Sequence, residues 1–239
     1  MCGRFILRAS AEQVARQFRL QRALPLEPRY NIAPTQPVAV VRRCPETGRR
    51  EMVWMRWGLV PRWSAGPEAL PAAINARSET VRQQRMFSES FAQRRCLIPA
   101  DGFYEWRRTG GSKQPYLLEL GQGELFALAG LWDQWLPRAD QPPLLSCTVL
   151  TVPARGVVAR LHDRMPLVLP EEAYDRWLET SAEDQEQLDA LLAQGVPAAR
   201  WQARPVSQAV NAPGNEGPGL LGPAESPFLP GLELGGGSG

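Results

Sequence analysis

The chain has 239 residues, of which 44% are hydrophobic and 22% charged, as expected for a globular protein with a buried core. No apolar run approaches the roughly 20 residues of a membrane-spanning helix, and the N-terminus has no apolar signal segment, so we expect a cytoplasmic protein without membrane contact. Four widely spaced cysteines and a single histidine argue against a disulfide framework, a zinc site or another metal site.

The net charge of +2 hides an asymmetry between the two halves of the chain. Residues 1–113 hold 20 Lys and Arg against 9 Asp and Glu, whereas residues 114–239 hold 7 against 16. Nearly all the basic residues are arginine, whose planar guanidinium binds phosphate and stacks on bases. Together with four tryptophans, the basic half is compatible with nucleic-acid contact, although composition alone favours a merely solvated arginine surface.

The first predicted elements are a helix, a loop and a hairpin. Ser10 followed by Gln13 predicts a capping box and a short helix that ends near Leu20. Four prolines predict that residues 25–37 form a loop. Residues 37–43 and 52–60 are rich in β-branched and apolar side chains and predict a β-hairpin.

Beyond the hairpin, Trp57 is expected in the core and Trp63 in an accessible loop, and Ser78 is expected to cap a helix that runs to about Ala92. Strands are predicted over residues 96–99, 116–120, 124–132, 145–152, 167–169 and 203–207, with 116–120, 124–132 and 145–152 in one sheet. Helices are predicted over residues 170–179 and 182–193.

This order of elements predicts one α+β domain over residues 1–211, with a mostly antiparallel sheet. Residues 212–239 are rich in Gly and Pro and are expected to form a disordered tail. The last five residues of the tail resemble an expression linker.

The N-terminus carries the most specific chemical signal. Met1 precedes a small residue and is a candidate for removal, after which Cys2 would carry an α-amine and a thiol on adjacent carbons. These groups have reference pKa values of about 8 and 8.5, so both react near neutral pH. The amine condenses with an aldehyde to an imine, and the thiolate then closes a thiazolidine. An N-terminal nucleophile that uses its own amine as base is an alternative, as is an incidental small residue.

Two further side chains are candidates for proton transfer. Glu105 lies between aromatic residues, so desolvation is expected to raise its pKa toward a useful acid–base range. A carboxylate paired with a nearby arginine is the alternative. His162 is flanked by Asp163 and Arg164 in a turn, a setting that favours a functional role, although a lone histidine is more often structural.

Five separated segments together resemble the SOS response-associated peptidase (SRAP) family of abasic-site processing proteins, over roughly Met1 to Asn211. They are Met1-Cys2-Gly3-Arg4-Phe5, Arg29-Tyr30-Asn31-Ile32-Ala33-Pro34, Asn75-Ala76-Arg77-Ser78-Glu79-Thr80, Asp101-Gly102-Phe103-Tyr104-Glu105-Trp106 and His162-Asp163-Arg164-Met165-Pro166. Each segment alone is weak evidence, whereas five in this order are specific. The resemblance implies a barrel-like β core with flanking helices.

The resemblance also implies a function. Met1 is removed, by the protein itself or by an aminopeptidase, and Cys2 forms a thiazolidine crosslink with the aldehyde of an abasic site in single-stranded DNA at replication forks. The implied active-site residues are Cys2, Asn75, Glu105 and His162. The implied DNA-binding residues are Arg4, Arg77, Arg85 and Arg164 for phosphates, with Pro34 and Trp63 as a wedge at single-strand/duplex junctions.

The chemistry of these residues agrees with that function. A carboxyl such as Glu105 assists sugar ring opening, an imidazole such as His162 moves a proton, and an amide such as Asn75 binds the sugar without added charge. The imine also permits β-elimination, so a weak lyase activity is expected. This chemistry needs no cofactor. Separately, we expect the protein to be a monomer that is associated with the nucleoid.

Two other classes of protein remain as alternatives. A Met-Cys-Gly start also resembles class II glutamine amidotransferases, but the Arg-Gly-Pro-Asp and Asn-Gly-Glu types of segment that bind glutamine in those enzymes are missing from this sequence. A non-enzymatic single-strand binder would explain the arginines and Trp63, yet it leaves Cys2, Glu105 and His162 without a role.

Overall fold

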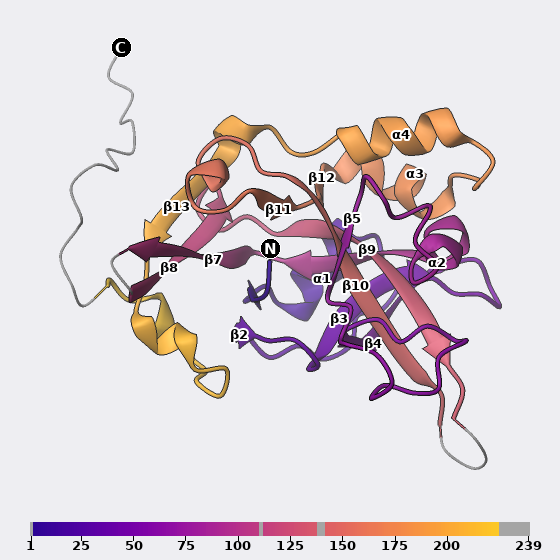
Figure 1. Cartoon of the computed structure of the whole chain (residues 1–239), viewed down its shortest axis with the longest axis horizontal. Helices are drawn as coiled ribbons and strands as arrows, with labels where there is room; N and C mark the ends of the chain where they lie inside the picture. The colour runs from indigo at the N-terminus through magenta and orange to yellow at the C-terminus, as the bar shows by residue number, and fades with distance from the viewer. Residues whose placement is uncertain (1, 110–111, 138–141, 225–239) are drawn as a thin grey trace.

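Five strands close into a barrel at the centre of the molecule (Figure 1). The structure is a computed structural model that describes residues 2–109, 112–137 and 142–224. Around the barrel the strands follow the order β10–β4–β3–β6–β9, and β9 pairs with β10 to close it. Their bounds are β3 (Pro37–Arg43), β4 (Arg50–Trp57), β6 (Arg95–Ala100), β9 (Phe126–Trp135) and β10 (Leu144–Pro153). All neighbours are antiparallel except β10 and β4, which run parallel.

Short strands extend this sheet beyond the barrel. The strand β5 (Asn75–Arg77) pairs in parallel with β10, whereas β11 (Arg164–Pro166) and β12 (Val168–Leu169) pair antiparallel with β10 and β9. A second, five-stranded sheet has the order β13–β8–β7–β1–β2. Its members are β1 (Phe5–Leu7), β2 (Arg29–Ile32), β7 (Gly102–Thr109), β8 (Ser112–Leu120) and β13 (Trp201–Pro205).

Helices cover the outside of the two sheets. In Figure 1, α3 (Tyr174–Glu179) and α4 (Gln185–Ala193) lie together above the barrel strands. The helix α1 (Ala11–Gln17) has the capping box predicted at its start, and α2 (Ser88–Gln93) packs near β6 and β9. Among the described residues, no helix is long and apolar enough to cross a membrane. The predicted fold class, a mostly antiparallel barrel-like core with flanking helices, is confirmed.

A buried aromatic pair joins the barrel to the second sheet. The side chain of Trp57 is fully buried, as predicted, and packs edge-on against Phe5 with 5.1 Å between ring centroids. Its indole nitrogen donates to the carbonyl of Ile74, 2.9 Å away. Because Phe5 belongs to the second sheet and Trp57 to the barrel, this pair joins the two sheets directly behind the N-terminus.

Three local predictions are wrong, each because tertiary contacts outweigh local preference. The proline-rich residues 25–37 include β2, which pairs with β1. Residues 78–87 form turns instead of a helix capped by Ser78, and α2 begins only at Ser88. Residues 116–120 lie in a different sheet from β9 and β10, because β8 pairs with β7 and β13.

The prediction of a disordered tail is also wrong for residues 212–224, because these residues pack against the domain. The amide nitrogen of Asn31 donates to the carbonyls of Ala212 and Asn215, 3.0 Å away in each case. The side chain of Leu220, in the 3-10 helix η5 (Pro218–Leu221), is buried. The remainder of the predicted tail, residues 225–239, lies outside the described residues.

Candidate active site and nucleic-acid surface

The segment that precedes β1 places Cys2 in the interior. The side chain of Cys2 is fully buried, and its Sγ lies 3.7 Å from the carbonyl oxygen of Arg4. The amide nitrogen of Asn75 donates to the carbonyl of Cys2 at 2.8 Å. Burial raises the pKa of the Cys2 thiol far above its usual range, and the charge of Glu105 acts in the same direction. The thiol of the full-length chain is therefore protonated at neutral pH.

Glu105 reaches the same place from β7. Phe5 of β1 pairs with Phe103, and Glu105 lies two residues further along β7, so it points to the same face as Phe103. Its side chain is buried, and burial raises its pKa, as predicted, while the charge of His162 opposes this shift. A buried carboxyl beside a thiol and an imidazole suits proton transfer.

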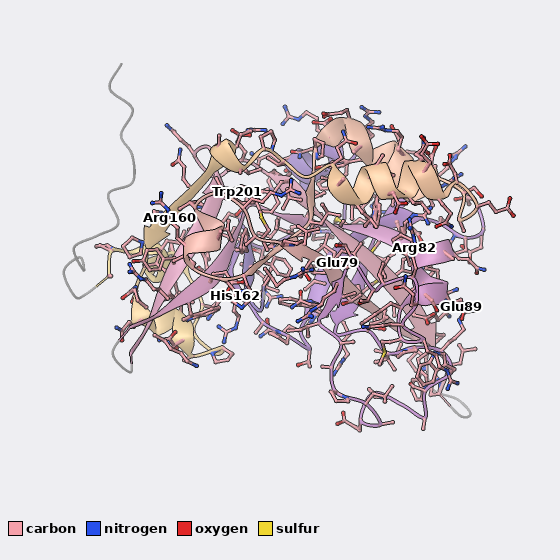
Figure 2. All side chains as sticks on the ribbon, turned by 45° about the horizontal axis from the view of Figure 1, so that its top comes forward. Glu79, Arg82, Glu89, Arg160, His162 and Trp201 are labelled. Carbon is pink, nitrogen blue, oxygen red and sulfur yellow. The ribbon has the colours of Figure 1, made fainter. Side chains whose placement is uncertain are left out.

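His162 lies in the turn between the 3-10 helix η1 (Val158–Arg160) and β11, on the same side of the molecule as Arg160 (Figure 2). Its Nδ1 is 2.9 Å from the backbone nitrogen of Arg164 and 2.6 Å from a carboxylate oxygen of Asp163. The backbone amide can only donate and is fixed, whereas the Asp163 side chain is 80% exposed and free to rotate. The amide therefore sets the tautomer of the neutral ring, with the proton on Nε2.

Asn75 completes the group. Parallel pairing with β10 places Asn75 opposite Val149. Ala76, the middle residue of β5, is buried, so the side chains of Asn75 and Arg77 point to the opposite face of the strand. The Oδ1 atom of Asn75 is buried and has no hydrogen-bond partner among the described residues. It is an acceptor for a donor that the described residues do not supply.

Two of the predicted phosphate-binding arginines are bonded within the protein. Arg4 donates to the Oδ1 of Asn31 at 2.7 Å and to the carbonyl of Val210 at 2.8 Å. Arg164 is largely buried, forms a two-pronged ion pair with Glu79, and also donates to the carbonyl of Thr151 at 2.6 Å. This ion pair lowers the pKa of Glu79 to about 2. The geometry therefore favours a role for both arginines in shaping the site.

The other two predicted arginines are exposed. Arg77 is at the end of β5 and Arg85 is in the turns before α2. The Cζ atom of Arg85 lies 4.3 Å from the ring centroid of Trp63, a cation–π contact, and Trp63 is 41% exposed. Pro34 is half-buried and is followed by Thr35 with φ of +70°, the left-handed backbone conformation that a β-branched residue rarely adopts. The predicted wedge residues are thus at the surface.

The loop that carries Trp63 is anchored at three points to the barrel. The buried carboxylate of Asp133 accepts from the backbone nitrogen of Arg62 at 3.0 Å. The indole nitrogen of Trp135 donates to the carbonyl of Ser64 at 3.0 Å, and the hydroxyl of Ser146 accepts from the nitrogen of Val60 at 2.8 Å. An exposed indole on a loop fixed in this way loses little conformational entropy when a base stacks on it.

Sequence analysis missed the residues that hold the site together. Asn31 and Glu79 belong to the segments that carry the family resemblance, but neither their residue type nor their spacing reveals that they bond Arg4 and Arg164. Asp133 did carry a signal, since a carboxylate in an otherwise apolar strand is rarely buried without a function or a partner. Within the described part of the chain, no group of three or more His, Cys, Asp or Glu side chains is arranged to hold a metal ion.

Known proteins resemble this chain over nearly its whole length. The family model described as SOS response associated peptidase (SRAP) matches residues 1–213. The abasic site processing protein YoqW of Bacillus subtilis is 36% identical over 226 residues, covering 92% of this chain and 99% of the relative. YedK of Escherichia coli, also named an abasic site processing protein, is 31% identical over 93% of this chain and 100% of the relative. This chain therefore belongs to the SRAP family, as its five segments predicted.

Solved structures share the fold. A protein from Bacteroides thetaiotaomicron superposes with a TM-score of 0.81 at 22% identity, covering 93% of this chain and 100% of the other. A protein from Bordetella bronchiseptica has a TM-score of 0.73 at 29% identity, covering 86% and 100% of the two chains. Membership in this family favours abasic-site processing over a glutamine amidotransferase or a single-strand binder without chemistry.

Proposed function

We propose that the protein processes abasic sites by forming a covalent thiazolidine between Cys2 and the open-chain aldehyde of the lesion in single-stranded DNA. The observation that carries the proposal is the convergence of Cys2, Glu105 and Asn75 at the N-terminal strand, with His162 close enough to affect the pKa of Glu105. Relatives that span the whole chain are named abasic site processing proteins, which supports the same class of substrate.

The reaction begins with hydrolysis of the Met1–Cys2 peptide bond, by the protein itself or by an aminopeptidase. The freed amine adds to the C1′ aldehyde and expels one water, which gives an imine. Sγ of Cys2 then bonds to C1′, the thiol proton moves away, and the imine nitrogen gains a proton and becomes a secondary amine. Each step balances without an oxidant, a reductant or a metal.

The neighbouring groups have defined roles in this scheme. A thiol held in its neutral form needs a base when it adds to the imine, and Glu105 is the nearby carboxyl with a raised pKa. His162, with its proton on Nε2, donates a hydrogen bond to the sugar oxygen and stabilises it as the ring opens. The free Oδ1 of Asn75 accepts a hydrogen bond from a sugar hydroxyl. β-Elimination from the imine gives a weak lyase side reaction.

The direct test is intact-mass spectrometry after incubation with an abasic single strand. We expect the protein without Met1 to gain the mass of the oligonucleotide less one water, and the adduct to survive heating. The matched control is the same strand with a tetrahydrofuran in place of the abasic sugar, because this analogue has no aldehyde and should give no adduct. An equal adduct with tetrahydrofuran, or none with the abasic strand, contradicts the proposal.

Salt dependence tests which arginines contact phosphate. Arg77→Ala and Arg85→Ala should each make the log–log salt slope of single-strand affinity shallower by about 0.7, because each exposed guanidinium releases one counterion. Arg164→Ala should mainly lower the free energy of unfolding, by about 1–3 kcal/mol, since it removes buried charged hydrogen bonds. The measurements are fluorescence anisotropy at several salt concentrations and urea unfolding.

The control for this series is Arg49→Ala, an exposed arginine before β4, which should leave the slope unchanged. Trp63→Ala should weaken binding at a single-strand/duplex junction at constant slope, because stacking releases no counterions. Equal slope changes for Arg49, Arg77 and Arg85 would indicate a diffuse basic field and would contradict the assignment.

A further inference from the structure

A groove of about 930 Å³ lies beside the turn that carries His162. Its floor is formed by the start of β13, including Trp201, and one wall by η1, which ends in Arg160. The backbone nitrogen of His162 donates to the carbonyl of Val158 at 3.0 Å, so η1 and the His162 turn are joined directly. We call this feature the Arg160 groove. None of the predicted site residues lines it.

The charge of the Arg160 groove is positive. Arg8, Arg160 and Arg204 line it, and Glu119 is the one carboxylate among its lining residues. Glu119 is already bonded to Arg8 at 2.8 Å and lies 3.4 Å from Arg204. Arg160 is exposed and forms no ion pair with any residue that the structure describes. The groove therefore presents one uncompensated guanidinium to an anionic ligand.

Trp201 adds a second, independent feature. Its ring packs edge-on against Phe103 and Phe126, with centroids 5.2 and 5.5 Å away, and only 5% of the residue is exposed. The indole nitrogen is nevertheless buried without an acceptor in the described part of the chain. An unsatisfied buried N–H costs about 1–3 kcal/mol, so an acceptor supplied by a ligand or by water is expected there.

The position of the groove fits a strand that crosses the site. Figure 2 shows Arg82 and Glu89, which flank Arg85 in the sequence, on one side of this face and Arg160 with Trp201 on the other. His162 is labelled below Trp201, on the same side of the view as Arg160. Because His162 is bonded to η1, a strand that is held at His162 can continue along η1 into the Arg160 groove.

We propose that the Arg160 groove binds the sugar–phosphate backbone of the single strand on the side of the lesion opposite the Trp63–Arg85 pair. This inference rests on the proposed function and adds a binding site to it. Arg160 contacts a phosphate, and a phosphate or sugar oxygen accepts from the Trp201 indole nitrogen. Recognition by charge and one indole donor is independent of base sequence.

The test compares tetrahydrofuran-containing strands of two lengths, so that no covalent step interferes. The short strands end one nucleotide beyond the lesion on one side, and the long strands extend several nucleotides on that side, with both sides tested in turn. For the full-length protein we expect a longer strand on one of the two sides to bind more tightly. Arg160→Ala should remove this length advantage and make the salt slope of the long strand shallower by about 0.7. Binding of the short strand should not change.

Three variants sharpen the test. Arg16→Ala removes an equally exposed arginine that lines a different groove and should keep the length advantage. Trp201→Phe keeps an aromatic ring but loses the N–H and should weaken only the long strand. Arg160→Lys should restore the salt slope.

Several outcomes would overturn the inference. One is an equal effect of Arg16 and Arg160, and another is a length advantage that survives Arg160→Ala. Competition by polyglutamate that depends on Arg160, without a length effect for DNA, would instead assign the groove to an acidic protein segment. These results differ from failure of the proposed function, in which the abasic strand gives no adduct even though the groove binds DNA.

Discussion

Replacement of Cys2 by alanine is expected to abolish the heat-stable DNA adduct completely. The thiazolidine needs both the α-amine and Sγ, and the variant keeps only the amine. A reversible imine should still form, and borohydride should reduce it to a stable secondary amine, so a reductively trapped adduct should remain. Gel electrophoresis of heated samples, with and without borohydride, measures both species.

Two controls separate the thiol from the amine. Cys44→Ala removes a partly exposed thiol outside the site and should leave the adduct unchanged. An uncleaved N-terminal tag blocks the amine of Cys2 and should remove the heat-stable and the borohydride-trapped adduct alike. A heat-stable adduct on the tagged protein would show that another nucleophile reacts.

Glu105→Gln is expected to slow adduct formation by about 10²–10⁴-fold, the usual contribution of a positioned general acid or base. Glutamine has the same shape but cannot exchange a proton. Because burial already favours the neutral form of Glu105, an uncharged amide should not destabilise the fold. Single-turnover rates measure the chemistry, and affinity for a tetrahydrofuran strand should stay nearly constant.

The pH dependence gives a second readout of Glu105. Burial raises the pKa of this carboxyl above its ordinary value of 4.5, and a base acts only when ionised. The rate of adduct formation should therefore fall as the pH drops through that raised pKa, at a pH above 4.5. The Glu105→Gln variant should lose this dependence on pH. The control Glu51→Gln removes a carboxylate that pairs with Arg42 on the β3–β4 hairpin, and it should keep the dependence. Parallel loss of rate and affinity in Glu105→Gln would indicate a structural role.

Much of this architecture follows from local sequence. The capping box at Ser10, the β3–β4 hairpin and the burial of Trp57 were predictable, because each depends on neighbouring residues or on side-chain type. The raised pKa of Glu105 was also predictable, since its flanking aromatics indicate burial. The family resemblance supplied the barrel-like core, which spacing alone would not reveal.

The remainder depends on contacts between distant residues. The turns at residues 78–87 replace a predicted helix in a segment where Glu79 pairs with Arg164, 85 positions away in sequence. The side chain of Asn31 binds backbone carbonyls near residue 212, and local composition there suggested only disorder. Arg4 and Arg164 were predicted to bind phosphates because the sequence does not reveal the internal partners of each guanidinium.

The bonds of Arg4 have a consequence for the order in which the protein becomes active during synthesis. Arg4 leaves the ribosome among the first residues, yet its acceptor on Val210 is 206 positions later. On the proposed function, a nascent N-terminus that loses Met1 carries a reactive aminothiol long before that acceptor exists. This group is open to reaction with cellular aldehydes, such as sugars and glyoxals, until residues near 210 fold back and bond Arg4.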